Sequence, residues 1–303
     1  MPPSRRTFLK VGGAAIAAVP LAIGADGFLW EPNRPRVVKV EIPLTRLPEA
    51  WEGFRIVQLS DFHYDPYCSV IPIRHSIRIV NELSPDLIVL TGDFVTAPTF
   101  GDQGRGEKAA LDAEPCAALL AQLRSRLGSY AVMGNHDGGS DSDMVSESLH
   151  SRGINVLRNR AVPLTQNGGR LWLAGIDDIL EGDPDLDLTL QGIPQDETVV
   201  FLAHEPDFAL EAARRNVDLQ LSGHSHGGQI LLPFVGAPWL PPLGRRFPRG
   251  MYNIRNLTLY TNVGLGTVRI PVRWNCPPEI TVIILRKGTA ARAGSFLKAL
   301  DSS

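Results

Sequence analysis

Five short blocks of the 303-residue chain combine Asp, Asn and His, and they contain five of its seven histidines. Each block ends an apolar stretch, and none carries a cysteine. The blocks are Asp61-Phe62-His63, Gly92-Asp93, Gly134-Asn135-His136-Asp137, Ala203-His204 and Gly223-His224-Ser225-His226. Oxygen and nitrogen ligands of this kind bind divalent transition metals, and their number suffices for two ions. The chemistry that they predict is metal-assisted catalysis.

The spacing within two of the blocks favours a shared metal. Asp61 and His63 are two residues apart, and so are His224 and His226. At the end of an extended segment, residues with this spacing point to the same side of the backbone. We interpret Ser225, between the two histidines, as a spacer. The sequence offers no covalent nucleophile at a matching position, so we expect direct attack by water on the substrate.

The apolar stretches before the blocks have the length and composition of β-strands. Strands are predicted at 37–44, 54–60, 86–91, 129–133, 154–157, 170–176, 198–203, 219–222, 257–261 and 280–285. Helices are predicted at 73–83, 114–126, 142–151 and 207–215, with a loop at 97–109. This order predicts an α/β fold in which the later strands pair in a mixed or antiparallel way. The ligand blocks then meet at the strand ends, where open α/β sheets gather their sites.

Glycines stand directly before several of the candidate ligands. They are Gly92, Gly134 and Gly223. Glycine allows tight turns and close backbone approach, which a crowded metal site requires.

The ordered set of blocks resembles the calcineurin-like metallophosphoesterase superfamily over roughly residues 37–286. The stretches LTGD (90–93), LSGHSHGGQ (221–229) and CPPEI (276–280) resemble its exported bacterial branch most. The resemblance implies a four-layer α/β/β/α sandwich with two mixed central β-sheets and a site at one edge. It also implies hydrolysis of a phosphate ester.

The resemblance further assigns a role to each candidate residue. One metal would be held by Asp61, His63, Asp93 and His226, and the other by Asp93, Asn135, His204 and His224. Asp93 would bridge the two ions. His136 would contact the phosphoryl group and assist the leaving group, with Asp137 orienting its ring.

Elementary chemistry agrees with these roles. Two divalent ions can polarise a phosphoryl oxygen and lower the pKa of a bound water, so that a metal-bound hydroxide attacks phosphorus in line. An imidazole such as His136 suits proton donation because it titrates near neutrality. Ligands without thiolate suit manganese, zinc, iron or nickel, and the residue types leave the choice open.

Asp177 and Asp178 follow another predicted strand and leave two interpretations open. They are either outer partners that hold a ligand histidine or part of a turn at the strand end. The chain also has three cysteines, Cys68, Cys116 and Cys276, whose spacing matches no zinc motif. Their odd number argues against a disulfide framework, and we expect them to be buried.

The N-terminus has the pattern of a targeting segment. Residues 4–10 (SRRTFLK) form a twin-arginine pattern before an apolar stretch at 11–23, too short for a comfortable membrane span. We therefore predict a twin-arginine signal or anchor at 1–25, a linker at 26–36, the metallophosphoesterase domain at 37–287 and a C-terminal tail at 288–303. The expected partner is the twin-arginine export machinery, and the expected location is the periplasm, the cell wall or the outer face of the cytoplasmic membrane.

Composition limits the other partners. Hydrophobic residues make up 44% and charged residues 20% of the chain, with a net charge of −2. We therefore expect no nucleic-acid partner. The stretch 231–250 joins Phe234 and Trp239 to Arg245, Arg246 and Arg249. This composition suits contact with a membrane surface or an amphiphilic phosphate, and a proline-stiffened loop packed on the domain is the alternative.

The sequence leaves the substrate open. We expect an exported phosphodiesterase or pyrophosphatase that acts on a lipid- or cell-wall-linked phosphate. The alternative is a broad phosphomonoesterase or nucleotide phosphodiesterase. A non-catalytic scaffold is disfavoured because the ligand set is complete, and a metallopeptidase because no general-base Glu accompanies the blocks.

Overall fold

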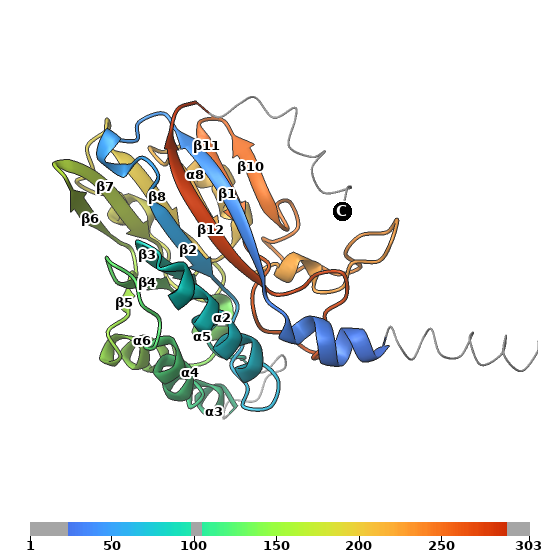
Figure 1. The fold of residues 1–303 in the computed structure, drawn as a ribbon. Coiled ribbons are helices and arrows are strands. Elements are labelled where there is room, and N and C mark those ends of the chain that lie inside the picture. The colour runs from blue at the N-terminus through green and yellow to red at the C-terminus, as the bar shows by residue number, and fades with distance from the viewer. Residues whose placement is uncertain (1–23, 98–104, 290–303) are drawn as a thin grey trace, which may run out of the picture.

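The computed structural model describes residues 24–97 and 105–289 (Figure 1). Most of the predicted signal segment, much of the predicted loop 97–109 and almost all of the predicted tail therefore lie outside the described residues. Two six-stranded sheets form the centre of the fold. Both sheets are mixed, which confirms the predicted α/β architecture with two mixed sheets.

The first sheet has the order β1-β12-β2-β3-β4-β5. Its strands are β1 (Arg36–Leu44), β12 (Glu279–Lys287), β2 (Arg55–Leu59), β3 (Leu87–Thr91), β4 (Ser129–Val132) and β5 (Asn155–Val156). Strands β2 to β5 run parallel, whereas β12 pairs antiparallel with β2 and parallel with β1.

The second sheet has the order β10-β11-β9-β8-β7-β6. Its strands are β10 (Gly250–Ile254), β11 (Leu257–Thr261), β9 (Leu219–Ser222), β8 (Thr198–Leu202), β7 (Gly169–Gly175) and β6 (Arg160–Gln166). The four inner strands run parallel, and each edge strand is antiparallel to its neighbour.

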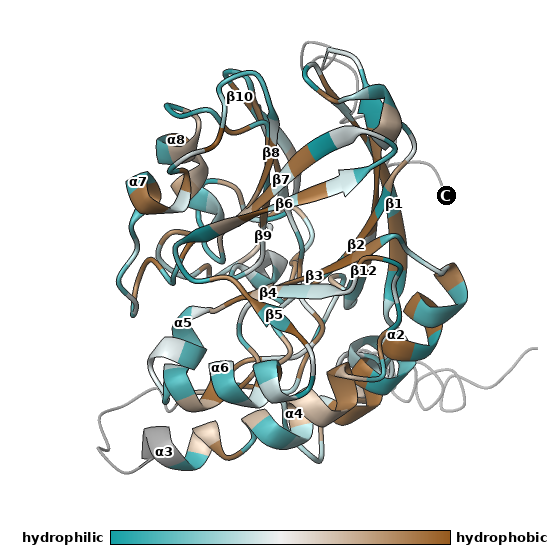
Figure 2. Cartoon of the chain, turned by 90° about the vertical axis from the view of Figure 1, so that its left-hand side faces the viewer, coloured by the Kyte–Doolittle hydropathy of each residue, from teal (hydrophilic) through white to brown (hydrophobic). Residues whose placement is uncertain are grey.

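Helices cover the outer faces of both sheets (Figure 2). On the first sheet lie α2 (Val70–Leu83), α3 (Arg105–Ala110), α4 (Ala113–Leu120), α5 (Asn135–Gly138) and α6 (Ser142–Ser151). The second sheet carries α7 (Leu186–Thr189) and α8 (Ala209–Ala212). Among the described residues, no helix combines the length and apolar character that crossing a membrane requires.

Alternating side chains explain the layers. In β3, Leu87 and Val89 pack between the two sheets, whereas Ile88 and Leu90 pack toward α2 and α4. Successive strand residues point to opposite faces, so a strand that is apolar on both faces must be covered on both. The second sheet repeats the arrangement, because its inner residues join the core between the sheets and its outer residues pack under α7 and α8.

The structure corrects several predicted elements. The strands β6 and β10 were not predicted, and both are half-exposed edge strands whose apolar pattern is weak. Helix α3 overlaps the second half of the predicted loop 97–109, in a stretch where Lys and Ala favour helix.

Helices near 114–126 and 207–215 are shorter than predicted. The first is α4, which ends at Leu120. Beyond it, Arg124 donates its backbone N–H to the side chain of Asn81, and Arg126 pairs with Asp86, so the chain turns toward β4. The second divides into a 3-10 turn (Pro206–Phe208) and α8.

The segment 26–36 contains helical structure. Two helical turns, Asp26–Trp30 and Glu31–Asn33, precede β1. Glu31 accepts the backbone N–H groups of Asn275 and Cys276. These hydrogen bonds hold the segment against the residues that precede β12. All three cysteines are free; Cys116 and Cys276 are buried as expected, whereas Cys68 is exposed.

Candidate metal centre

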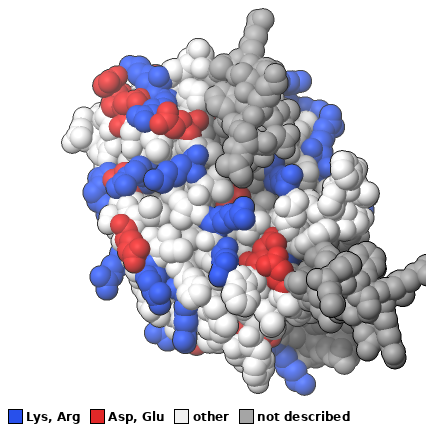
Figure 3. Space-filling view, turned by 45° about the vertical axis from the view of Figure 1, so that its right-hand side comes forward, with Lys and Arg blue, Asp and Glu red and all other residues white. Residues whose placement is uncertain are grey.

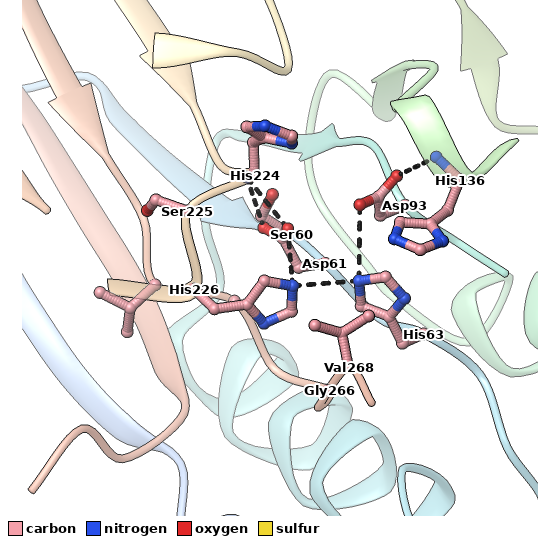
Figure 4. Close-up of polar contacts among 12 residues, drawn as sticks. Ser60, Asp61, His63, Asp93, His136, His224, Ser225, His226, Gly266 and Val268 are labelled. Atoms are coloured by element: carbon pink, nitrogen blue, oxygen red, sulfur yellow. Dashed lines mark hydrogen bonds and ion pairs between the residues drawn. The ribbon is translucent and has the colours of Figure 1, made fainter. Parts of the chain in front are cut away.

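The candidate ligands lie at the carboxyl ends of parallel strands from both sheets. Asp61 and His63 follow β2, and Asp93 follows β3. From the second sheet, His204 follows β8, and the pair His224 and His226 follows β9. Because parallel strands present their carboxyl ends at one edge, blocks far apart in sequence meet at a single site (Figure 4).

A first cluster consists of Asp61, His63, Asp93 and His226, all buried. The Nε2 atoms of His63 and His226 lie 3.0 Å apart. The Nε2 of His63 is 3.4 Å from Oδ2 of Asp93, and the Nε2 of His226 is 3.3 Å from Oδ1 of Asp61. Two carboxylates and two inward-facing imidazole nitrogens at this separation form the donor set of a divalent cation.

A second cluster shares Asp93 with the first and adds His204 and His224. The Nε2 of His204 lies 3.1 Å from Oδ2 of Asp93. Nδ1 of His224 and Oδ1 of Asn135 are buried, and neither has a hydrogen-bond partner among the described residues. Buried polar atoms without partners are costly unless something binds them. The residues present therefore fit a second cation beside the first.

Neighbouring groups hold the ligand rings from outside. The Nδ1 of His204 donates to the carbonyl oxygen of Thr91 at 2.6 Å, and the Nε2 of His224 donates to that of Pro242 at 2.7 Å. A carbonyl only accepts, so these bonds place the proton on the outer nitrogen and leave the inner lone pair for a metal. Nδ1 of His63 contacts Oγ1 of Thr96 at 3.1 Å.

Backbone strain is concentrated at the centre. Five of the candidate ligands adopt left-handed backbone conformations: Asp61, His63, Asp93, His224 and His226, with φ between 41° and 68°. Non-glycine residues rarely adopt this region. Such strain persists only where the surrounding structure enforces it, which is typical of functional sites.

The three predicted glycines confirm the close backbone approach. A Cβ on Gly134 would lie 2.4 Å from Oδ1 of Asp93, and one on Gly223 would lie 1.9 Å from Oγ of Ser60. A Cβ on Gly92 would lie 2.8 Å from the backbone nitrogen of Gly134. Any larger residue would displace the ligands.

His136 lies beside the first cluster without joining it. Its ring centroid is 4.7 Å from that of His63, and the two rings are nearly perpendicular (Figure 4). Its Nδ1 has no hydrogen-bond partner within the described part of the chain. Its backbone N–H donates to Oδ1 of Asp93 at 2.9 Å, so the backbone of the block is tied to the shared ligand.

The predicted role of Asp137 is wrong. We expected its carboxylate to orient the ring of His136, but both of its oxygens accept backbone N–H groups instead. The donors are Asp93 (2.9 Å), Phe94 (2.8 Å), Val95 (3.2 Å) and Gly134 (2.9 Å). The buried carboxylate of Asp137 therefore fixes the backbone around Asp93 through hydrogen bonds.

Electrostatics single out Asp93. Burial alone would raise its pKa, but the imidazoles of His204 and His136 outweigh burial and hold the pKa well below the usual value. Burial disfavours the charged form of an imidazole and lowers the pKa of His136 to about 4. Burial, together with the nearby His204, lowers the pKa of His224 to about 3. Burial and the charge of Asp93 raise the pKa of Asp137 to about 7.

Other residues singled out in the sequence have structural roles. Oγ of Ser225 donates to the carbonyl oxygen of Pro248 and accepts the N–H of Gly227, which agrees with a spacer. Asp177 pairs with Arg158 at 3.0 Å, and Asp178 accepts the N–H groups of Leu180 and Glu181. These contacts favour the strand-end turn over a partner for a ligand ring.

Sequence reasoning missed the loop after β11. A Cβ on Gly264 would lie 2.6 Å from that of Asp61, and one on Gly266 would lie 2.2 Å from the carbonyl oxygen of Phe62. The buried guanidinium of Arg273 donates to the carbonyl oxygens of Val263 and Gly266 and so holds this loop against the ligands. The available signal was the pair of closely spaced glycines (264 and 266) directly after a predicted strand.

The fold and the two Asp/His clusters define the class of metal-dependent phosphoesterases. A family model described as calcineurin-like phosphoesterase matches residues 54–228. The uncharacterized metallophosphoesterase YkuE of Bacillus subtilis (strain 168) is 38% identical over 93% of this chain and 98% of its own length. The phosphodiesterase YaeI of Escherichia coli (strain K12) is 30% identical over 93% of this chain and 99% of its own.

The chain belongs to the calcineurin-like phosphoesterase family. Among solved structures, an archaeal phosphodiesterase is similar at 14% identity with a TM-score of 0.38, over 71% of this chain and 88% of its own. The family match and the clusters together identify the chain as a metallophosphoesterase with a buried Asp/His metal-binding cluster.

Proposed function

We propose that the chain is an exported phosphoesterase with two metal ions that hydrolyses a phosphodiester or pyrophosphate bond in a lipid- or cell-wall-linked molecule. The observation that carries the reaction is the sharing of Asp93 between two clusters, with His136 directly beside them. The relative YaeI is described as a phosphodiesterase, which supports the preference for a diester.

The residues would divide the work as follows. Asp61, His63, Asp93 and His226 would hold one ion, and Asp93, Asn135, His204 and His224 the other. The bound ions would polarise the phosphoryl group and acidify the attacking water. The identity of the ions follows from availability among manganese, zinc, iron and nickel.

His136 would act on the substrate rather than on the metal. Its half-buried ring is neutral at neutral pH because burial lowers its pKa to about 4. A neutral ring still offers one N–H, which can donate to a phosphoryl oxygen and stabilise the charge that develops there. Asp137 would contribute by keeping the backbone of Asp93 in place, since it accepts that backbone N–H.

Turnover of defined esters by the metal-reconstituted protein tests the reaction. We expect bis-p-nitrophenyl phosphate to react faster than p-nitrophenyl phosphate. The reverse order would support the alternative, a broad phosphomonoesterase. If the protein hydrolyses neither ester, and also fails to hydrolyse phospholipids, a nucleotide-linked lipid and wall phosphodiesters, the result would favour a non-catalytic scaffold.

Export rests on the sequence SRRTFLK at residues 4–10. Replacement of Arg5 and Arg6 by Lys keeps the charge and removes the paired guanidinium groups. We expect the wild-type chain in the periplasm, in the cell wall or on the outer face of the membrane, and the double variant in the cytoplasm. The same distribution for both chains would contradict the twin-arginine route.

A further inference from the structure

Large apolar side chains are exposed on three neighbouring segments beside the metal centre. The first segment is the helical turn Asp26–Trp30, the second is the loop 232–239, and the third is the loop 266–272. Their exposed apolar residues form what we call the apolar face: Phe28, Leu29, Trp30, Phe234, Val235, Trp239 and Ile270. Phe234 is completely exposed, which is costly for a side chain of this size unless something covers it.

Backbone hydrogen bonds and a stacking contact join the three segments into one surface. The backbone N–H of Arg273 donates to the carbonyl oxygen of Gly27 at 3.0 Å, and that of Leu231 donates to Trp274 at 2.9 Å. The guanidinium of Arg269 stacks over the ring of Trp239 at 4.3 Å. Residues 269–274 thus connect the N-terminal turn to the loop 232–239 (Figure 1).

The charge of the second and third segments is one-sided, whereas the first segment carries Asp26. From Leu219 to Pro278 the sequence contains no Asp and no Glu, but it contains six arginines: Arg245, Arg246, Arg249, Arg255, Arg269 and Arg273. Figure 3 shows a side of the molecule on which Lys and Arg lie over a broad area, with patches of Asp and Glu among them and wide uncharged areas between. Aromatic and aliphatic side chains beside arginines are complementary to the interface of an anionic bilayer.

The stretch 231–250 divides into two parts. Residues 232–239 carry the exposed Phe234, Val235 and Trp239. The remainder packs on the domain, because Pro242 accepts the Nε2–H of His224 and the backbone N–H of Arg246 donates to Asp207. Residues 232–239 are therefore exposed and open to contact with a membrane, whereas the rest of the stretch is a loop packed on the domain.

The apolar face adjoins the metal centre. The loop that carries Ile270 begins at Gly266, whose backbone N–H donates to the carbonyl oxygen of Asp61 at 2.7 Å. Val268 of the same loop lies below His63 and His226 (Figure 4). The chain also enters this face directly from the apolar sequence 11–23.

We propose that the apolar face docks on the surface of an anionic lipid bilayer and brings the metal centre to the headgroup layer. Phe234, Val235 and Phe28 enter the interface, while Arg269 pairs with lipid phosphate and stacks on Trp239. The docking does not depend on catalysis. Its consequence for the substrate, a phosphate linked to a lipid tail, rests on the function proposed above.

Vesicle binding by the full chain tests the docking. Vesicles of phosphatidylglycerol and phosphatidylcholine with brominated acyl chains should quench the fluorescence of Trp30 and Trp239, and the variants Trp30→Phe and Trp239→Phe should each lose part of this quenching. Replacement of both Phe234 and Val235 by Ser should weaken the binding at least about tenfold. The control is Leu188→Ser on α7, which replaces an exposed apolar side chain by β6 at the far edge of the second sheet.

A second test of the docking varies the charge of the vesicles. Arg269→Glu should weaken binding to anionic vesicles and leave binding to pure phosphatidylcholine unchanged. Equal binding by the wild type and the Ser double variant, without quenching of Trp30 or Trp239, would overturn the proposal. A third outcome is possible: the wild type forms a dimer in sedimentation and binds no vesicles, and the Ser double variant is monomeric. That outcome would assign the face to a second copy of the chain.

Failure of docking and failure of the proposed function are distinguishable. Vesicle binding is measured with a chelator present, where no hydrolysis occurs, and hydrolysis is measured on water-soluble bis-p-nitrophenyl phosphate without vesicles. The Ser double variant should bind vesicles poorly and still hydrolyse the soluble ester at the wild-type rate. Equal loss of both would show that the substitutions damage the fold.

Discussion

The carboxylate of Asp137 accepts the backbone N–H of Asp93 at 2.9 Å. The acid that follows His136 in the sequence therefore positions the acid that the two metal clusters share. Asp93 in turn accepts the backbone N–H of His136 at 2.9 Å through its Oδ1. These reciprocal bonds join the ends of β3 and β4 into one rigid unit.

Asp93→Asn should remove the charge on which both clusters depend. Bound metal should fall below two ions per chain, and kcat/KM should fall by more than the ~100-fold that loss of an outer partner causes. Metal analysis and turnover of bis-p-nitrophenyl phosphate measure both effects. Asp177→Asn is the matched control, since Asp177 pairs with Arg158 and belongs to neither cluster. Retention of two tightly bound ions in the Asp93 variant would contradict the bridging role.

His136→Ala should separate catalysis from metal binding. The ring contacts no cluster atom as a ligand, so the metal content should stay at the wild-type level. Turnover should fall by about 100-fold, the usual range for a group that stabilises a transferring proton or charge. Loss of metal from this variant would show that His136 is a ligand.

Gly223→Ala should disrupt the centre through the backbone. A Cβ at this position would meet Ser60 and Asp61, at 1.9 and 2.3 Å. We expect a fall in thermal stability and loss of metal, since neither neighbour can move without displacing the ligands. Gly24→Ala, where a Cβ meets nothing within 4 Å, is the control. Similar melting temperatures for the two variants would argue against the close approach.

Thr96→Val tests the outer support of His63. The substitution keeps the shape of the side chain and removes the hydroxyl that contacts Nδ1 of His63 at 3.1 Å. Metal affinity should fall by about 10- to 100-fold while the fold is retained. Competition with a chelating dye measures the affinity. An unchanged affinity would show that the hydroxyl does not hold the ring.

The pH dependence of unfolding tests the burial of His136 in the metal-free chain. Its pKa is about 4 in the folded state and 6.5 in the unfolded state, so between these values only the unfolded state carries the proton. This histidine therefore makes the free energy of unfolding decrease as pH falls from 6.5 to 4, by about 1.4 kcal/mol per pH unit. In His136→Gln this part of the slope should disappear. Parallel curves for the wild type and the variant would contradict the shift.

The local sequence predicts which residues are candidate ligands and that each of them follows a strand. Asp61 and His63 are two residues apart and join the same cluster, as their spacing predicts. His224 and His226 have the same spacing but divide between the two clusters, so the expectation that this pair shares one metal is wrong. Apolar strands that alternate with helices predict an α/β fold, because both faces of such strands must be covered, whereas the sandwich of two sheets is what the family resemblance implies. The edge strands β6 and β10 escaped prediction, since half-exposed strands lack a continuous apolar pattern.

Contacts between distant segments follow only from the three-dimensional packing. Asp137 lies next to His136 in sequence, yet its carboxylate accepts three backbone N–H groups from residues 93–95 after β3 and one from Gly134 after β4. The loop at Gly264 and Gly266 follows β11 of the second sheet and reaches Asp61, which follows β2 of the first sheet. The apolar face likewise arises from three segments whose separate patterns are weak. Hydrogen bonding and burial act between residues that folding brings together, and linear spacing does not report them.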